Sequence, residues 1–205
     1  MRVSVLLLSA ATAILTSEYA QAQEFPPSQN VDDSHRHLGF FLRPDIGYGY
    51  MSSSGGGATI ARAAFFGSLH VGGALAENLL LGANVYAGGA GKSNSILIDG
   101  MVPPVSDSAT VLAGIGPEVT YYLMPANVYL SATIGLTTLA IIPVGQNSAP
   151  GHGGFGGRIG VGKEWWVSRH WGLGLVGHAS ESWNSVDGVT YSTWSLGAAF
   201  SATYN

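Results

Sequence analysis

The sequence predicts an all-β protein, an eight-stranded antiparallel up-and-down β-barrel whose strands are transmembrane. Three observations support this fold class. Apolar residues alternate with small or polar residues through most of the chain. Charged residues make up only 10% of it, which is too few to cover the surface of an ordinary soluble domain. The connections between these runs are alternately short and long along the chain, as they are in membrane barrels.

The N-terminal 22 residues have the features of a secretory signal peptide. Arg2 supplies a positive start, "VSVLLLSAATAIL" an apolar middle and "AQA" a cleavage site of small residues. The apolar stretch is shorter than the roughly 20 residues that a membrane-spanning helix requires. Residues 23–37 are polar and contain proline, so we expect a flexible N-terminal tail there. The barrel domain is expected to occupy residues 38–205.

Eight runs with a period of two are the predicted strands. Each run has large apolar residues on one face and mostly Gly, Ser, Thr or an isolated charge on the other, as where Phe40 and Ile46 oppose Arg43. The runs cover residues 38–51, 61–75, 79–86, 110–121, 128–137, 155–165, 171–180 and 193–204. Pro44 and Pro117 fall inside two of them, and because proline lacks a backbone donor we expect a β-bulge at each.

The connections between these runs are expected to differ at the two ends of the barrel. Tight turns are predicted at residues 76–78, 124–127 and 167–170. Longer loops are predicted at "SSSGGGA", residues 88–108, residues 139–154 and "ESWNSVDGVTY". This arrangement is typical of outer-membrane barrels, which have short periplasmic turns and longer external loops.

The polar face of the strands decides which face points outward. It is mostly small and carries few Lys or Glu, so it suits the narrow interior of an eight-stranded barrel better than a water-exposed surface. The apolar face is therefore expected to contact lipid. Aromatic residues near the tight turns would form a girdle at one membrane interface: Tyr121, Tyr122, Tyr129, Trp165, Trp166, Trp171 and Tyr204. A second girdle is expected near the loops: Tyr48, Tyr50, Tyr86, Phe155, Trp183, Tyr191 and Trp194.

Three stretches carry a resemblance to a known class of proteins. They are "AGIGPEVTYYL", "GVGKEWWVSRHWGLGLVG" and "WSLGAAFSATY". In pattern they resemble the strand-turn-strand units of small Gram-negative outer-membrane β-barrel proteins, the OmpA and OmpX transmembrane-barrel class. The resemblance extends over nearly all of residues 38–205. It implies a location in the outer membrane, contact with outer-membrane lipids and lipopolysaccharide, and insertion by the barrel-assembly machinery.

Strand phase places six charged residues in the lumen. Three are basic and three acidic: Arg43, Asp45, Arg62, Glu118, Arg158 and Glu164. Unpaired charges in a confined space are costly, so we expect these residues to form a mutually neutralising network that holds the strand register. A gated ion path through the lumen is the alternative, which the narrow width of an eight-stranded barrel disfavours.

The segment "GHASES" is the main candidate for catalysis. His178 and Ser180 share one strand face and Glu181 is adjacent, which resembles the His-x-Ser pair of the outer-membrane lipid A deacylase PagL. Serine, histidine and an acid are the groups that ester hydrolysis requires. The strand phase turns His178 and Ser180 inward, however, where acyl chains do not reach. No catalytic residue is therefore assigned.

The remaining features suggest no cofactor. His35 and His37 offer two metal ligands without a third, so no metal site is predicted. The net charge of −4 argues against a nucleic-acid partner. We expect a non-enzymatic integral outer-membrane protein whose external loops serve envelope integrity, adhesion or another surface interaction. The alternatives are a narrow pore for ions or small solutes and a lipid A-modifying hydrolase.

Overall fold

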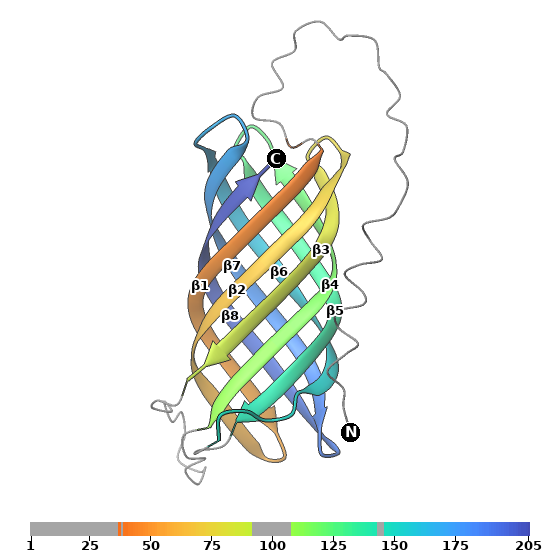
Figure 1. The fold of residues 1–205 in the computed structure, drawn as a ribbon, viewed down its shortest axis with the longest axis vertical. Coiled ribbons are helices and arrows are strands. Elements are labelled where there is room, and N and C mark those ends of the chain that lie inside the picture. The colour runs from red at the N-terminus through yellow and green to blue at the C-terminus, as the bar shows by residue number, and fades with distance from the viewer. Residues whose placement is uncertain (1–36, 38, 92–107, 143–145) are drawn as a thin grey trace, which may run out of the picture. The chain divides into compact units, whose positions relative to one another are not determined.

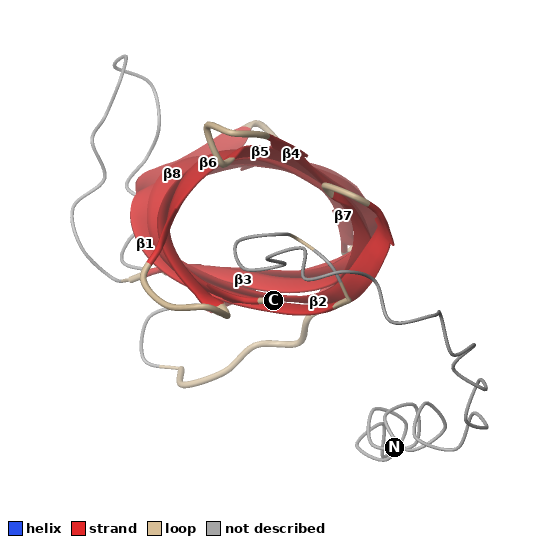
Figure 2. Ribbon diagram, turned by 90° about the horizontal axis from the view of Figure 1, so that it is seen from above, coloured by secondary structure: helices blue, strands red, loops and turns tan. Residues whose placement is uncertain are grey.

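A closed antiparallel β-barrel is formed by the part of the chain that the computed structural model describes, residues 37, 39–91, 108–142 and 146–205 (Figure 1). Each strand pairs with its neighbours in sequence, and β1 pairs with β8 to close the ring that is seen along the axis in Figure 2. The strands are β1 (Phe40–Gly55), β2 (Ala58–Ala76), β3 (Leu79–Ala90), β4 (Ala109–Leu123), β5 (Val128–Ile142), β6 (His152–Trp166), β7 (Trp171–Val186) and β8 (Val189–Tyr204). The predicted eight-stranded up-and-down barrel is confirmed. The predicted signal peptide and nearly all of the predicted tail lie outside the described residues.

One end of the barrel, which we call the turn end, carries the three tight connections that the sequence predicts. They are residues 77–78, 124–127 and 167–170, at the top of Figure 1, where β1 also begins and β8 ends. Asn78 and Asn127 adopt positive φ angles of 66° and 51°. Asparagine tolerates this left-handed conformation better than most residues, which favours a sharp reversal of the chain at both positions.

The opposite end, which we call the loop end, differs from the prediction. Two of the four expected long loops are two-residue turns, at residues 56–57 and 187–188. Gly56, Gly57, Asp187 and Gly188 all have positive φ angles, as two-residue hairpin turns require. The neighbouring polar residues therefore continue the strands instead of forming loops. The connections at residues 91–108 and 143–151 remain longer segments, as predicted.

The two prolines inside strands do not produce the predicted bulges. Pro44 pairs with Leu69, and Pro117 pairs with Ala83, both in ladders that keep their register. Alternate residues of an antiparallel strand direct their N–H groups to opposite neighbours, so a proline removes one bond on one side without displacing the chain. The register shift that the structure does show lies between Ala74 and Ala76, next to a tight turn.

The outer wall of the barrel is apolar. Ile46, Phe65, Leu136 and Phe200 are each about 70% exposed, at 69%, 70%, 69% and 72%, although they belong to four different strands. A water-soluble domain rarely exposes apolar side chains on this scale. A lipid-facing wall has this composition, so the outward direction of the apolar face agrees with the prediction. No helix among the described residues is long and apolar enough to cross a membrane.

The lumen contains two apolar clusters separated along the strands by polar residues. The turn-end cluster consists of Phe41, Leu80, Tyr122, Tyr129, Val176 and Ala199. The loop-end cluster consists of Met51, Ala64, Phe66, Ala90, Leu112 and Leu139. Glycines on neighbouring strands make room for the lumenal rings, since a Cβ at Gly162 would collide with Tyr129 and one at Gly114 with Tyr86. The small residues of the inner face are therefore part of the packing.

Candidate functional site

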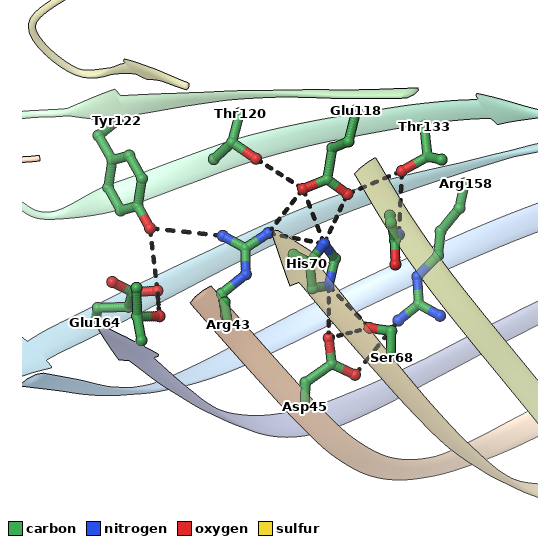
Figure 3. Close-up of polar contacts among 12 residues, drawn as sticks. Arg43, Asp45, Ser68, His70, Glu118, Thr120, Tyr122, Thr133, Arg158 and Glu164 are labelled. Carbon is green, nitrogen blue, oxygen red and sulfur yellow. Dashed lines mark hydrogen bonds and ion pairs between the residues drawn. The ribbon is translucent and has the colours of Figure 1, made fainter. Parts of the chain in front are cut away.

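All six charged residues that the sequence places in the lumen are buried there. Their relative exposures lie between 1% and 8%. They come from β1 (Arg43 and Asp45), β2 (Arg62), β4 (Glu118) and β6 (Arg158 and Glu164). Five of them form one connected cluster together with His70 and Tyr122, and we call this group the lumen cluster (Figure 3). Arg62 is bound elsewhere.

His70 on β2 is the centre of the lumen cluster, although the sequence did not group it with the six charged residues. Its Nδ1 lies 2.7 Å from Oε2 of Glu118, and its Nε2 lies 2.9 Å from Oδ2 of Asp45. Figure 3 shows the imidazole between the two carboxylates. Two arginines face three carboxylates in the cluster, and His70 can supply a third positive charge when it is protonated. The sequence signal was the shared inward phase of His70 and Ser68.

Glu118 receives the largest number of donors described in the cluster. Arg43 Nη2 donates to its Oε1 over 3.2 Å, and the hydroxyls of Thr120 and Thr133 donate to Oε1 and Oε2 over 3.0 and 2.9 Å. Asn84 in turn donates to the Thr133 hydroxyl over 3.1 Å. A buried carboxylate is tolerated when its lone pairs are filled in this way. Glu118 therefore joins β1, β2, β4 and β5 across the lumen.

Asp45 lies on the opposite side of His70 from Glu118. Its Oδ1 lies 3.7 Å from Nη2 of Arg158, and its Oδ2 accepts a hydrogen bond from the Ser68 hydroxyl. The guanidinium of Arg158 also lies 5.5 Å from the centre of the Tyr86 ring. These contacts connect β1 to β2 and β6. The pairing of Asp45 with Arg158 crosses the lumen, so neighbouring positions in the sequence did not reveal it.

Glu164 is attached to the cluster through a tyrosine. The Tyr122 hydroxyl donates to Glu164 Oε1 over 3.2 Å. The same hydroxyl accepts a hydrogen bond from Nη1 of Arg43 over 3.5 Å. The Thr203 hydroxyl donates to the same carboxylate oxygen over 2.6 Å. Arg43 also stands 4.2 Å from the centre of the Tyr129 ring, a cation–π geometry. The turn-end cluster and the lumen cluster are thus packed into each other.

Arg62 does not join the lumen cluster. Its Nη1 donates to the backbone carbonyl oxygens of Ser108 and of Gly91, the latter over 3.1 Å. These two residues flank the connection between β3 and β4, so Arg62 binds both ends of that connection. The prediction that all six charges neutralise one another is corrected in this respect. Strand phase indicates the lumen but not the height along the axis, and Arg62 lies nearer the loop end than its predicted partners.

The aromatic residues predicted as a girdle at the turn end divide into two groups. Tyr121, Trp165 and Trp171 point outward with exposures of 48%, 50% and 43%, and the Tyr204 ring lies edge-on 5.3 Å from that of Trp171. The lumen-facing members are Tyr122 and Tyr129, which are 1% and 0% exposed, and Trp166, whose ring stands 5.2 Å from that of His37. The assignment of these three to the girdle is wrong.

The reason for this correction is the two-residue period of a strand. Successive side chains point to opposite faces, so Tyr121 and Tyr122 cannot both contact lipid, and neither can Trp165 and Trp166. Tyr86, predicted for the girdle near the loops, is likewise 5% exposed in the lumen. Tyr48, Phe155, Trp183 and Trp194 are exposed on the outer wall near that end. Tyr191, also predicted for that girdle, is partly buried and packs against the loop-end cluster instead.

His37, the last residue of the predicted tail, lies inside the turn end of the barrel. Its ring stacks on Tyr122 at 3.5 Å between centroids and is 0% exposed. Its Nε2 lies 2.8 Å from Oδ1 of Asn127, and its Nδ1 lies 3.3 Å from Oδ1 of Asn205. The flexible conformation expected there therefore does not apply to His37, because an aromatic partner and two amides hold its ring. His35 lies outside the described residues.

The three residues considered for ester hydrolysis are not assembled as a catalytic triad. His178 is 2% exposed in the lumen, where its ring contacts Phe66 edge-on at 4.9 Å. The Ser180 hydroxyl is 2.6 Å from that of Ser195 and forms no described hydrogen bond with His178. Glu181 belongs to the opposite face of β7 and is exposed on the outer wall. Among the described residues, no three His, Cys, Asp or Glu side chains are placed to hold a metal ion.

Comparison with known proteins identifies the fold. No protein-family model and no curated protein sequence matches the chain. Neisserial surface protein A has a similar structure, with a TM-score of 0.52, 15% identity and coverage of 80% of this chain and 96% of that protein. Ail of Yersinia pestis, crystallised with the heparin analogue sucrose octasulfate, gives a TM-score of 0.44, 15% identity and coverage of 80% and 99%. The N-terminal β-barrel domain of Pseudomonas aeruginosa OprF gives a TM-score of 0.40 and 14% identity, and the match covers 80% of this chain and 98% of that domain.

The chain therefore has the fold of a small outer-membrane β-barrel. The likeness to Neisserial surface protein A supports the fold, and at 15% identity it is restricted to the fold. The apolar outer wall and the closed ring of eight strands agree with this class. The protein is a membrane β-barrel.

Proposed function

We propose that this chain is a non-enzymatic integral protein of a bacterial outer membrane that serves as a closed anchor and presents its loop end at the cell surface. On this proposal the barrel itself conducts neither ions nor solutes. The surface end contributes to envelope integrity or to adhesion, and lipopolysaccharide surrounds the wall. The two longer connections, at residues 91–108 and 143–151, would carry the surface interactions.

The packing of the lumen is the observation that carries this proposal. The lumen cluster connects β1, β2, β4 and β6 by direct contacts across the interior. The turn-end cluster and the loop-end cluster lie on either side of it along the strands. An ion could pass only if several buried pairs separated together, which is unfavourable in a low-dielectric interior. This arrangement favours a structural plug over the narrow-pore alternative.

Planar-bilayer conductance tests the proposal. The protein would first be purified from outer membranes, where a boiling-dependent shift in gel mobility identifies the folded barrel. We expect no discrete conductance steps from the folded protein. Glu118→Gln keeps the shape of the side chain while removing its charge, and Ile46→Leu is a matched control on the outer wall. Conductance steps in the unmodified protein whose size changes with Glu118→Gln but not with Ile46→Leu would establish a pore and refute the closed-anchor proposal.

A further inference from the structure

The outer wall has a groove over β5 to β8. A concave region of about 640 Å³ is lined mainly by apolar side chains, including Ile134, Phe155 and Trp183. A second region of about 440 Å³ includes Leu130 and Val161 among its lining residues. Ile159, Ala179 and Leu196 line both regions, so the two regions adjoin along the wall.

Small outward-facing residues form the floor of this groove. Gly157 and Gly177 carry no side chain, and Ala179, which lies between their levels along the barrel axis, adds only a methyl group. A Cβ at Gly177 would meet its nearest neighbouring atom at 3.9 Å, so space is open above this position. Ile159 and Leu196, which are 64% and 58% exposed, rise beside the floor as walls. The depression therefore runs along the lipid-facing surface between ridges of large apolar side chains.

One charged residue stands where the groove reaches the loop-end girdle. Glu181 is exposed on the outer wall and pairs across the strands with Gly157 and Trp194. Trp183, two residues along the same face of β7, is 47% exposed, and Trp194 is 45% exposed. The hydrogen bond described for the Glu181 carboxylate comes from the Ser192 hydroxyl over 3.4 Å, which is long. Ionisable residues on a lipid-facing wall are costly and are often functional.

We propose that this groove binds one membrane lipid whose headgroup carries a primary ammonium group. Aromatic girdles mark the headgroup level of a membrane, so the anionic end of the groove lies at that level and its apolar length extends into the hydrocarbon. An acyl chain fits the apolar length, and an ammonium group complements the Glu181 carboxylate in both charge and donor capacity. This inference goes beyond the proposed function, because it assigns a ligand to the outer wall and is independent of whether the lumen conducts.

Native mass spectrometry tests the proposal directly. The full-length protein would be reconstituted into vesicles of equimolar phosphatidylethanolamine and phosphatidylglycerol with identical acyl chains, then released into mild detergent. We expect one retained lipid per barrel, with phosphatidylethanolamine enriched about threefold as for an interfacial ion pair. Ala179→Trp should abolish retention of both lipids because the indole fills the groove. Glu181→Gln should retain lipid but bring the ratio of the two headgroups to about one, because an uncharged amide leaves only a weak preference.

Matched variants separate this effect from general damage to the barrel. Ala83→Trp adds the same indole to an exposed alanine on β3, and Asp187→Asn removes a charge from a loop-end turn, so both should behave as wild type. If the Ala179→Trp variant shows no boiling-dependent mobility shift, and so has not folded, Ala179→Leu fills the groove with a smaller side chain in its place. Equal retention of the two lipids by wild type, or undiminished retention after the groove is filled, would overturn the proposal. A dimer mass that disappears with Ala179→Trp would do the same, by assigning the groove to a second copy of the chain.

Discussion

The lumen and the outer wall are built from alternate residues of the same strands, and two glutamates show how differently they treat the same side chain. Glu118 is 5% exposed and receives hydrogen bonds or ion pairs from Arg43, His70 and two threonines. Glu181 is exposed on the wall with a long contact from Ser192. The side-chain chemistry is identical, so the partners and the burial decide what each residue contributes. Three comparisons between variants test this contrast, in order of decreasing effect.

Replacing each of the two glutamates with alanine in turn should give the largest difference in stability between the lumen and the outer wall. Glu118→Ala leaves Arg43 and His70 buried without their shared partner, which should lower the free energy of unfolding by about 3–5 kcal/mol. Glu181→Ala should change it by less than about 1 kcal/mol because that carboxylate is exposed. Urea unfolding of the barrel in phospholipid vesicles, followed by tryptophan fluorescence, measures both. Equal losses in the two variants would contradict the contrast between buried and exposed positions.

A charge placed on the wall should have the next largest effect. Ile46 is 69% exposed and lies between Phe40 and Tyr50 on the apolar face of β1. Ile46→Arg should destabilise the barrel in vesicles by about 2–4 kcal/mol, because the guanidinium would face hydrocarbon. Ile46→Leu, which keeps the apolar volume, is the control. If the arginine variant inserts and unfolds like the control, the apolar face is not the lipid-facing one.

The smallest effect is expected from a pair of adjacent serines. Ser53 is 1% exposed, and its hydroxyl is 2.8 Å from that of Thr193 in the lumen, whereas the exposed Ser54 hydroxyl is 2.9 Å from that of Thr59. Ser53→Ala should lower the free energy of unfolding by about 1 kcal/mol because it leaves the buried Thr193 hydroxyl without its partner. Ser54→Ala should be close to neutral, since water replaces the lost bond. The same urea series resolves the two, and a larger loss at Ser54 would contradict the assignment of faces.

Much of the fold could be predicted from the sequence because it depends on local patterns. The period of two identified all eight strands, and the phase of each run placed Arg43, Glu118 and Arg158 inside. The three tight connections of the turn end were also visible as breaks in that pattern. The girdle prediction is wrong at Tyr122 and Trp166 for a local reason, because strict alternation already excludes both residues from the lipid face.

The loop-end turns carry a second kind of local signal. Asp187 and Gly188 adopt positive φ angles between two long strands, and Asp-Gly is a common sequence for such a hairpin. The polar residues around them favour a loop only if polarity is equated with irregular structure. Polar strands that extend beyond the apolar belt follow the same pairing rules as the rest of the sheet.

Other features were decided only by the tertiary structure. His70 meets Glu118 across 48 residues of chain and Asp45 across 25, and Arg62 reaches Ser108 instead of the acids predicted for it. The groove on the wall likewise needs four strands side by side. By itself the sequence determined the central part of each strand and the face that each side chain takes there, because both follow from the geometry of one strand. The partners across the lumen depended on register and on closure of the ring, which arise only when all eight strands are paired.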